Sequence, residues 1–460
     1  MSQTAFSSLP LPAEVLSNIQ ALGYEVMTPI QAQCIPLALN GKDLLAQAKT
    51  GSGKTAAFGI GLLDRLTIQD YQTQAVVLCP TRELADQVSK EIRRLARAIP
   101  NTKVLTLCGG KPLGPQFASL EHNPHIVVGT PGRILKHLQK GSLELNNLNM
   151  LVLDEADRML DMGFQEDIMH IISFMPKQRQ TLLFSATYPD EIKNISNLIQ
   201  QDPIDIRIDE KDERSKIKQF FYEIDKGERT EKLIALLHHY RPESSVIFCN
   251  RKHQCQELAD ELWQKGFHAL ALHGDLDQKE RDRVLVQFSN KSSSILIATD
   301  VAARGLDIKD LEAVINFELS PDPEVHVHRI GRTGRAGKEG IALSLFMASE
   351  SPKVSAIEKY QNISARIDNT ATLKAREHFK LIPPMVTLVI NGGRKDKVRA
   401  GDLLGALTAN KVILGKQIGK IDITDHLAYV AVERPISKQA LKILSEGKIK
   451  GRKFRVRKLN

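Results

Sequence analysis

Three groups of side chains have types and spacings that suit chemistry on a triphosphate. The first is the segment Ala48-Lys49-Thr50-Gly51-Ser52-Gly53-Lys54-Thr55, which follows the apolar run "DLLAQA". Glycines in such a loop let successive backbone N–H groups converge on phosphate oxygens at a helix start. Lys54 would reach the β- and γ-phosphates, and the Thr55 hydroxyl would bind Mg²⁺. The segment predicts a P-loop, although Ala48 stands where the motif usually has a glycine.

The second group is acidic and lies in "LVLDEADRML" (151–160), where three carboxylates follow an apolar run. A helix start tolerates acids because of the helix dipole, and a divalent cation would offset their repulsion further. In P-loop ATPases a second strand ends in an Asp that holds Mg²⁺, and Asp154 stands at this place. Glu155 is then expected to orient or deprotonate the attacking water. Asp157, one turn along, would face other motifs rather than the metal.

The third group is the set of arginines in "HRIGRTGRAG" (328–337), at positions 329, 332 and 335. A spacing of three residues would align them on one face of a helix. Such a face is usually solvated. The spacing alone therefore leaves open whether these arginines bind phosphate or water.

The composition excludes several classes of protein. The chain has 460 residues, which suggests about three domains. Its five cysteines are odd in number and form no C-x-x-C pair, which argues against a disulfide framework or a zinc site. The start "MSQTAFSSLPLP" lacks the features of a secretory signal, and no apolar run reaches the ~18 residues of a membrane span. We therefore expect a soluble, cytoplasmic protein.

Two α/β units are expected to position the three groups. In residues 1–207, short apolar runs at 75–79, 126–130, 150–154 and 181–185 alternate with helical patterns such as Glu83–Ile99. A charged stretch at 208–217 predicts a linker. The same alternation returns in 218–362, with apolar runs at 246–249, 269–273, 295–299, 314–317 and 341–346. Continuous apolar strands between helices predict parallel sheets that are covered on both faces.

A third unit is expected after a second polar stretch, 363–383. Residues 384–460 hold 17 Lys/Arg against 6 Asp/Glu, a net charge of +11, whereas the rest of the chain holds 46 against 48. This asymmetry is typical of a chain in which one module supplies phosphate affinity. Strand-like and helical patterns follow one another in the order βαββαβ, the ferredoxin-like arrangement of RNA-recognition modules.

Together these motifs resemble those of the DEAD-box RNA helicases over nearly all of residues 1–350, which implies two tandem RecA-like domains. "GYEVMTPIQ" (23–31) is similar to the family's Q motif, and Phe6 lies 17 positions before Gly23. The resemblance implies that Thr28 and Gln31 bind the nucleotide, that Gln31 reads the hydrogen-bonding edge of adenine and that Phe6 stacks on it.

The resemblance implies further roles. Arg332 and Arg335 become arginine fingers for the γ-phosphate, and Gly305 and Asp307 approach the nucleotide. Coupling of hydrolysis to strand separation falls to Asp157, Ser185, Thr187 and His328. In the first domain the implied RNA contacts are Pro80, Thr81, Arg82, Gly110, Thr130, Pro131, Gly132 and Arg133. In the second domain they are Arg251, Gln278, Arg281, Thr299 and Asp300.

The basic third unit has few of the aromatic side chains on which an RNA-recognition module stacks bases, since its two central strands offer only Tyr429. Its cations are therefore expected to clamp a structured hairpin, and those in question are Lys395, Lys397, Arg399, Lys450, Arg452, Lys453 and Arg455. The unit resembles that of a bacterial branch of the family. This implies a hairpin of 23S ribosomal RNA as target, RNA-dependent ATPase activity and a role in assembling the large ribosomal subunit. We expect the protein to act as a monomer.

Three hypotheses follow for the activity. The protein is an ATP-dependent helicase on ribosomal RNA, an ATP-gated RNA clamp or annealing chaperone, or a DNA translocase. The Q motif, "DEAD" (154–157), "SAT" (185–187) and the RNA-type third unit disfavour the translocase. The motifs do not separate the first two hypotheses, because both require closure around ATP and RNA.

Overall fold

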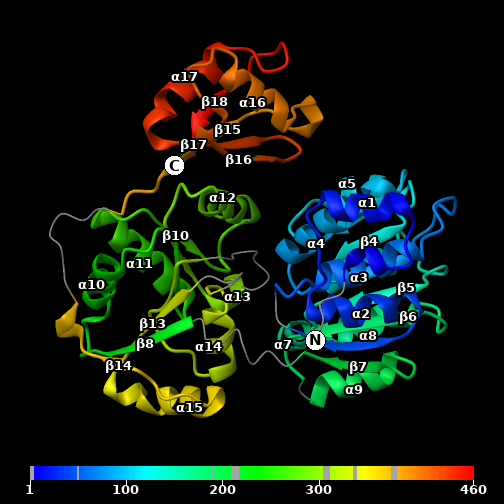
Figure 1. Cartoon of the computed structure of the whole chain (residues 1–460), viewed down its shortest axis with the longest axis horizontal. Coiled ribbons are helices and arrows are strands. Elements are labelled where there is room, and N and C mark those ends of the chain that lie inside the picture. The colour runs from blue at the N-terminus through cyan, green and yellow to red at the C-terminus, as the bar shows by residue number, and fades with distance from the viewer. Residues whose placement is uncertain are drawn as a thin grey trace. The chain divides into compact units, whose positions relative to one another are not determined.

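The structure is a computed structural model that describes residues 5–48, 51–188, 190–208, 217–303, 311–334, 339–373 and 381–459. The chain forms two compact units that divide near residue 210, and we describe each by itself (Figure 1). Every helix in the described ranges is too short or too polar to cross a bilayer. All five cysteines are buried.

The first unit contains a seven-stranded parallel sheet in the order β3-β4-β2-β5-β6-β1-β7. Its strands are β1 (Leu44–Gln47), β2 (Ala75–Leu78), β3 (Val104–Leu107), β4 (Ile126–Gly129), β5 (Met150–Leu153), β6 (Gln180–Ser185) and β7 (Ile204–Arg207). Its helices are η1 (Phe6–Ser8), α1 (Ala13–Ala21), α2 (Pro29–Leu39), α3 (Lys54–Asp64), α4 (Arg82–Leu95), η2 (Ala96–Ala98), α5 (Leu113–Leu120), α6 (Pro131–Gln139), α7 (Ala156–Asp161), α8 (Gln165–Ser173) and α9 (Asp190–Ile199).

Both faces of this sheet are buried, as the continuous apolar strands predict. In β1, Leu44 and Ala46 belong to one apolar cluster with α2, α3 and α4, whereas Leu45 belongs to a second cluster with α6 and α8. Successive side chains of a strand point to opposite faces of the sheet. A strand that is apolar at every position therefore needs helices packed against both faces. The predicted helix at 83–99 is shorter than expected, since α4 ends at Leu95 and the single turn η2 follows.

The second unit begins with another seven-stranded parallel sheet, in the order β10-β11-β9-β12-β13-β8-β14. Its strands are β8 (Ile217–Glu223), β9 (Ser245–Phe248), β10 (Ala269–Leu272), β11 (Ile295–Ala298), β12 (Ala313–Asn316), β13 (Gly340–Phe346) and β14 (Ile367–Asp368). Its helices are α10 (Arg229–Tyr240), α11 (Lys252–Gln264), α12 (Gln278–Ser289), α13 (Asp300–Ala303), α14 (Pro323–Ile330), η4 (Ala348–Glu350), α15 (Ser351–Gln361) and η5 (Thr370–Thr372). The stretch 363–383 was expected to be a connector between domains. Its first part instead contains the short strand β14, which extends this sheet by pairing with β8.

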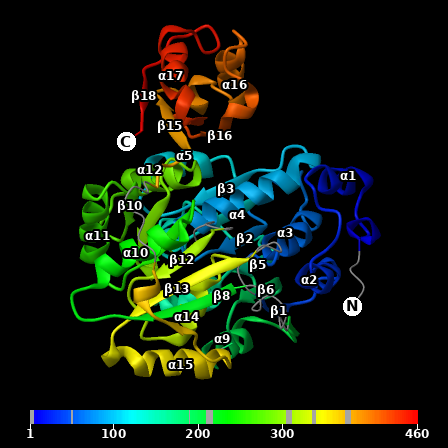
Figure 2. The same cartoon turned by 60° about the vertical axis from the view of Figure 1, so that its left-hand side comes forward.

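The same unit ends in a small α/β domain with a four-stranded antiparallel sheet, order β16-β17-β15-β18. It consists of β15 (Met385–Ile390), α16 (Ala400–Thr408), β16 (Ile418–Ile423), β17 (Ala428–Glu433), α17 (Ser437–Glu446) and β18 (Val456–Lys458), with short turns η6 (Arg394–Asp396), η7 (Gly415–Gln417) and η8 (Arg434–Ile436). Both helices pack on one face of the sheet (Figure 2). This confirms the predicted βαββαβ order and the predicted fold class.

Candidate active site and nucleic-acid interface

The P-loop, the acidic cluster and the "SAT" segment lie at one edge of the first sheet. They follow β1, β5 and β6, which are parallel neighbours, and Gln47 at the end of β1 pairs with Ser185 at the end of β6. Carboxyl ends of parallel strands are the usual place for ligands in open α/β sheets. The topology therefore brings together residues that are more than 130 positions apart in the chain.

The P-loop backbone adopts the conformation that the glycines allow. Gly51 has φ +90° and Gly53 has φ +95°, in the left-handed region that favours glycine. Helix α3 begins at Lys54, whose side chain is 5 % exposed and whose Nζ donates to the carbonyl of Ala48 at 2.8 Å. A lysine held inside a loop at a helix start is poised for an anion. Lys49 and Thr50 lie outside the described residues.

The Q-motif side chains contact this loop directly. Thr28 Oγ1 donates to the carbonyl of Ser52 at 2.8 Å, and Gln31 Nε2 donates to the carbonyl of Gly53 at 3.1 Å. A Cβ at Gly53 would lie only 2.4 Å from that same Nε2, so the approach requires glycine. Phe6 is 2 % exposed, and its ring centroid lies 5.6 Å from that of Tyr24. Its stacking on adenine stays a prediction.

Asp154 and Glu155 are buried side by side at the end of β5. Burial raises the pKa of Asp154 to about 6; the charge of Lys54 opposes this shift and that of Glu155 adds to it. Asp154 Oδ1 has no hydrogen-bond partner among the described residues. Glu155 has φ +55°, and its Oε2 accepts from Arg158 Nη1 at 2.8 Å, with both side chains at most 4 % exposed. Glu155 is thus paired with a cation, whereas Oδ1 of Asp154 accepts no hydrogen bond from the described residues.

Asp157 faces the end of β6. Its Oδ2 accepts from the backbone N–H of Ala186 at 3.0 Å, from that of Thr187 at 2.9 Å and from the Thr187 hydroxyl at 3.0 Å. Burial alone would raise the pKa of Asp157, but the charges of Lys54 and Arg158 and the bonds from Thr187 lower it overall. A carboxylate therefore ties the acidic cluster to the "SAT" segment.

The donor set fits a magnesium ion that is shared with a phosphate. Among the described residues no group of three or more His, Cys, Asp or Glu side chains could hold a metal alone. Mg²⁺ commonly binds to only one or two carboxylates, with phosphate oxygens and waters as its other ligands. The unused Oδ1 of Asp154 suits this arrangement.

The candidate RNA-binding residues of the first domain lie at the ends of β2, β3 and β4. Thr81 Oγ1 caps α4 by accepting from the N–H of Leu84 at 3.2 Å, and Pro80 precedes it. Gly110 has φ +76°, and a Cβ there would lie 1.9 Å from Arg82 Nη1. The adjoining helix α6 starts at Pro131 behind Thr130, and Gly132 and Arg133 form its first turn. The predicted residues are thus neighbours at one edge of the sheet.

In the second domain a fully buried arginine organises the corresponding edge. Arg329 Nε and Nη2 donate to the two oxygens of Asp300 at 2.6 and 2.7 Å. The other bonds of Arg329 go to the side chains of Asn250 and Asn316 and to the carbonyl of Glu318, so all five of its N–H groups are used. Arg329 therefore joins the ends of β9, β11 and β12 and fixes the carboxylate of Asp300, a predicted RNA contact.

Arg329 and Arg332 do not share one helical face, which corrects that expectation for these two arginines. Helix α14 ends at Ile330 with Gly331 as its C-cap, so Arg332 lies beyond the helix, where it is 6 % exposed. The three-residue register therefore ends with the helix. Arg335, Gly305 and Asp307 lie outside the described residues.

The remaining predicted residues of the second domain surround the same edge. Arg251 precedes α11 and is exposed, and Gln278 and Arg281 occupy the first turn of α12. Thr299 precedes α13 and accepts from the N–H of Ala302 at 3.4 Å. His328 lies in the last turn of α14. Their contacts with RNA stay predictions.

Two basic segments of the C-terminal domain come together. Lys450 Nζ donates to the carbonyl of Lys397 at 3.2 Å, and the N–H of Asn391 donates to the carbonyl of Arg455 at 3.0 Å. All seven predicted cations are exposed: Lys395, Lys397, Arg399, Lys450, Arg452, Lys453 and Arg455. We call these two segments, 394–399 and 447–455, the basic clamp.

Tyr429 is not part of this exposed surface. It is 4 % exposed and packs with Val389 and Leu459 on the sheet face opposite the helices, where Val286 of α12 covers it. Thr387 of the same face contacts Asn290 and Ser292, which follow α12, at 3.2 and 2.7 Å. The face on which RNA-recognition modules usually stack bases is therefore buried within this unit, and base stacking on Tyr429 gains no support.

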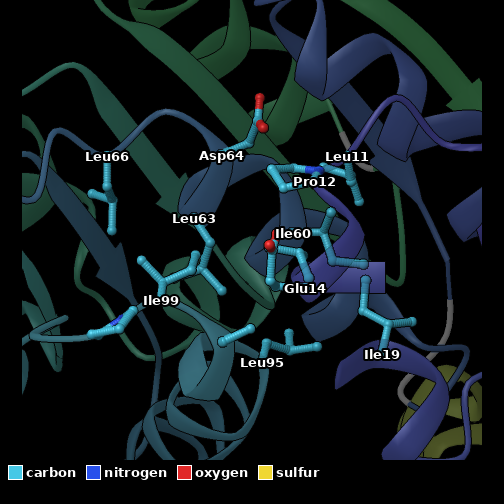
Figure 3. A pocket seen from close by; sticks show the side chains of 13 residues that line it. Leu11, Pro12, Glu14, Ile19, Ile60, Leu63, Asp64, Leu66, Leu95 and Ile99 are labelled. Atoms are coloured by element: carbon cyan, nitrogen blue, oxygen red, sulfur yellow. The ribbon is translucent and has the colours of Figure 1, made fainter. Parts of the chain in front are cut away.

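A separate cavity of about 300 Å³ lies in the first domain, between α1, the far end of α3 and η2 (Figure 3). Its lining is mostly aliphatic, with the carboxyl groups of Glu14 and Asp64 among it. None of its lining residues belongs to the P-loop or to the acidic cluster. It is therefore distinct from the nucleotide site.

Three residues of these sites were not assigned from the sequence. Arg158 pairs with Glu155, Arg329 fixes Asp300, and Gln116 contacts Arg133. Arg158 had a signal, because a basic residue three positions after an acid can pair with it on a helix. Gln116 had none, since its partners come from other elements.

Comparison with known families agrees with this geometry. Residues 28–195 match the DEAD/DEAH box helicase family, and residues 228–337 match the helicase conserved C-terminal domain. Residues 387–458 match the DbpA RNA binding domain. The three matches correspond to the two parallel-sheet domains and the small antiparallel domain.

Individual proteins support the same assignment. The chain is 54 % identical to the ATP-dependent RNA helicase DbpA of Escherichia coli (strain K12), over 99 % of this chain and 100 % of that protein. It is 44 % identical to the DEAD-box ATP-dependent RNA helicase CshA of Geobacillus kaustophilus, over 77 % of this chain and 76 % of that protein. Among solved structures, S. cerevisiae Dbp5 bound to RNA and ADP BeF3 gives a TM-score of 0.73 at 31 % identity, covering 80 % of this chain and 96 % of the other. The chain therefore belongs to the DEAD/DEAH box helicase family, as an ATP-dependent RNA helicase with a C-terminal RNA-binding domain of the DbpA type.

Proposed function

We propose that this helicase separates short duplexes of ribosomal RNA during assembly of the large ribosomal subunit, and that its C-terminal domain directs it to a hairpin of 23S ribosomal RNA. It would act as a monomer in the cytoplasm. The observation that carries the targeting is the basic clamp, two adjoining segments that include the seven predicted cations. Clustered cations suit the closely spaced phosphates of a folded hairpin, and they do not need an aromatic platform.

In the proposed reaction the first domain binds ATP. Lys54 would neutralise the β- and γ-phosphates, and the N–H groups of the P-loop would bind their oxygens. Thr55 and Asp154 would hold Mg²⁺, which supplies charge neutralisation at the phosphates when it is bound. Gln31, which already contacts the P-loop, would read the adenine edge, and Phe6 would stack on the ring.

Hydrolysis would depend on Glu155 and on arginines from the second domain. Glu155 orients the attacking water, and Arg332 and Arg335 stabilise the charge that develops on the γ-phosphate. Arginine fingers of this kind are worth roughly 10³–10⁵ in rate. Asp157, through its bonds to Thr187, would transmit the state of the nucleotide to the "SAT" segment.

RNA would be held through its backbone along the strand ends of both domains, by the residue sets predicted above. Contacts of this kind carry little base information, so selectivity would come from the C-terminal domain. When ATP and RNA close the two domains on one strand, its partner strand loses base pairs locally. Hydrolysis would then reopen the domains and release the strand.

The decisive experiment measures which RNA stimulates ATP hydrolysis at low concentration. We expect 23S ribosomal RNA to activate the full chain at much lower concentrations than generic RNA of equal length. Removal of residues 384–460 should abolish this preference while high concentrations of any RNA still stimulate. A preference that survives the deletion would move recognition into the two parallel-sheet domains. Strand displacement on a duplex beside the hairpin separates the helicase from the alternative of an ATP-gated clamp or annealing chaperone.

A further inference from the structure

Gln116 is a buried amide on α5 that joins the RNA-binding motifs of the first domain. Gln116 is only 6 % exposed. A buried amide is costly unless its polar atoms are bonded, so its partners show what it holds in place. These partners come from the loop after β3 and from helix α6.

Each end of the amide has a separate task. Oε1 accepts from Arg133 Nη1 at 2.8 Å and from His137 Nε2 at 3.0 Å. Nε2 donates to the carbonyl of Cys108 at 3.1 Å, immediately before Gly109-Gly110. A flipped amide would point N–H groups at the guanidinium, so only one orientation satisfies all three partners.

His137 anchors the amide from the next turn of α6. Because Gln116 Oε1 can only accept, His137 Nε2 must carry the proton. The Ser142 hydroxyl lies 2.9 Å from Nδ1 and 3.1 Å from the backbone carbonyl of His137, and its single hydrogen can serve either acceptor. Burial lowers the pKa of His137, and the charges of Arg133 and Lys136 lower it further, so the ring is neutral at physiological pH. A neutral ring adds no charge to the RNA-binding edge.

Arg133 is the residue that this network orients. Its Nη1 also donates to the carbonyl of Lys111 at 2.9 Å, so both N–H groups of Nη1 are bonded inside the domain. The edge formed by Nε and Nη2 is then the one that can meet a phosphate with two parallel bonds. The same network fixes the loop 108–111, which carries Gly110.

We propose that Gln116 is a positioning residue for RNA binding, which holds the guanidinium of Arg133 and the loop 108–111 in the geometry that grips one RNA strand. This inference rests on the proposed function, in which Arg133 contacts RNA. A purely structural role would make the same hydrogen bonds but would leave RNA affinity untouched at equal stability. The experiment must therefore separate RNA affinity from stability and from chemistry.

Gln180 provides a matched control. It is also a buried glutamine, 3 % exposed, and it donates to the carbonyls of Ala38 and Lys42 and accepts from Arg65. It is the first residue of β6, whereas "SAT" begins at the last residue of that strand. Methionine has nearly the shape of glutamine without its hydrogen bonds, so Gln116→Met and Gln180→Met make the same chemical change at the two sites.

The test compares ATP hydrolysis by the full chain as a function of RNA concentration. For Gln116→Met we expect the RNA concentration at half-maximal rate to rise about tenfold, equivalent to losing one bond to a charged group. The rate at saturating RNA and the KM for ATP should stay near the wild-type values. Gln180→Met should lower the melting temperature without changing the RNA concentration at half-maximal rate. An equal rise in both variants, or no rise in Gln116→Met, would overturn the proposal.

A double-mutant cycle identifies the route of the effect. If Gln116 acts mainly through Arg133, Gln116→Met should weaken RNA binding less in the Arg133→Ala background than in the wild type, because only its contact with the loop 108–111 is then left to lose. Additive effects would show that Gln116 does not act through Arg133 and would refute the proposal. If Arg133→Ala binds RNA as tightly as the wild type, Arg133 does not contact RNA. That outcome would contradict the proposed function rather than the role of Gln116 alone. Arg133→Lys keeps the positive charge but loses the planar guanidinium fork. It should therefore raise the RNA concentration at half-maximal rate by about as much as Gln116→Met, and it tests the same geometry if Gln116→Met folds poorly.

Discussion

At the scale of single residues, the acidic cluster places three carboxylates in three different situations. Asp154 keeps an unused buried oxygen, Glu155 is paired with Arg158, and Asp157 is bound by the "SAT" segment. Glu155 also has φ +55°, a conformation that costs a non-glycine residue roughly 1–2 kcal/mol. The cluster is thus arranged so that each acid has one task.

Replacing Glu155 by Gln should keep ATP binding but reduce turnover by about 10² or more, because an amide cannot serve as a base and orients water poorly. Nucleotide titration and phosphate release at saturating RNA measure the two quantities. Glu144→Gln makes the same change at an exposed position and should leave both unaltered. Steady phosphate release by Glu155→Gln near the wild-type rate would refute the role of Glu155.

The raised pKa of Asp154 predicts a pH-dependent stability. A carboxyl whose pKa is higher in the folded state, here about 6 against an ordinary 3.8, binds more protons when folded, so its charged form destabilises the fold as pH rises through that range. Asp154→Asn should therefore melt at a higher temperature than the wild type at pH 8 in EDTA. Its free energy of unfolding should exceed that of the wild type by no more than about 3 kcal/mol. The difference should vanish near pH 4. An equal difference at both pH values would exclude this titration as the cause.

At the scale of elements, helix α12 has two functional ends. Its first turn holds Gln278 and Arg281, which are predicted to contact RNA, and its last turn and the residues after it contact the sheet of the C-terminal domain. One rigid helix thus joins the RNA-binding edge of the second domain to the domain that carries the basic clamp. RNA held by the clamp would therefore have a defined position relative to that edge.

An engineered disulfide can test this contact in solution. Ser292 and Thr387 have hydroxyl oxygens 2.7 Å apart, so the pair Ser292→Cys/Thr387→Cys should form a disulfide readily with oxidised glutathione. Val286→Asp would bury a charge among Val389, Tyr429 and Leu459, and it should slow formation about tenfold or more. Val412→Asp, the same change at a 54 % exposed valine, is the control and should have no effect. Equal rates in both backgrounds would contradict the contact.

Much of the fold could be predicted from the sequence because parallel strands are buried on both faces. Runs such as 75–79 and 295–299 become β2 and β11 with their ends shifted by one residue. The short strand β14 could not be predicted, because two residues carry no periodicity and pair only through the tertiary fold. The same distinction applies to the site. The P-loop is local, whereas the contacts of Gln116 and Arg329 join segments far apart in the chain.

At the scale of the whole molecule, positive charge is concentrated at the C-terminus. Residues 384–460 carry a net charge of +11, from 17 basic and 6 acidic residues, while the rest of the chain is nearly neutral. Charge of this kind contributes affinity by releasing counterions from RNA, and this contribution weakens as salt rises. The two parallel-sheet domains contain the ATP-binding motifs, and we expect the C-terminal domain to supply most of the electrostatic attraction for RNA.

Salt dependence should identify the cations that touch RNA. Lys395→Ala/Lys397→Ala removes two cations of the basic clamp and should flatten the slope of log Kd for the hairpin against log salt by about 1.4, given ~0.7 per phosphate contact. Lys438→Ala/Lys442→Ala removes two exposed cations from α17, and its slope should match that of the wild type. Filter binding at several KCl concentrations measures both. Equal flattening in the two variants would mean that net charge, rather than the clamp, attracts RNA.

The burial of all five cysteines has a practical consequence. Thiol-reactive dyes need an accessible sulfur, so the native chain should remain almost unlabelled under folding conditions. A single cysteine placed on an exposed position of each domain then becomes a unique attachment point, with no need to remove native residues. Pairs of such dyes would report by energy transfer how far the domains lie from one another at each stage of the ATP cycle.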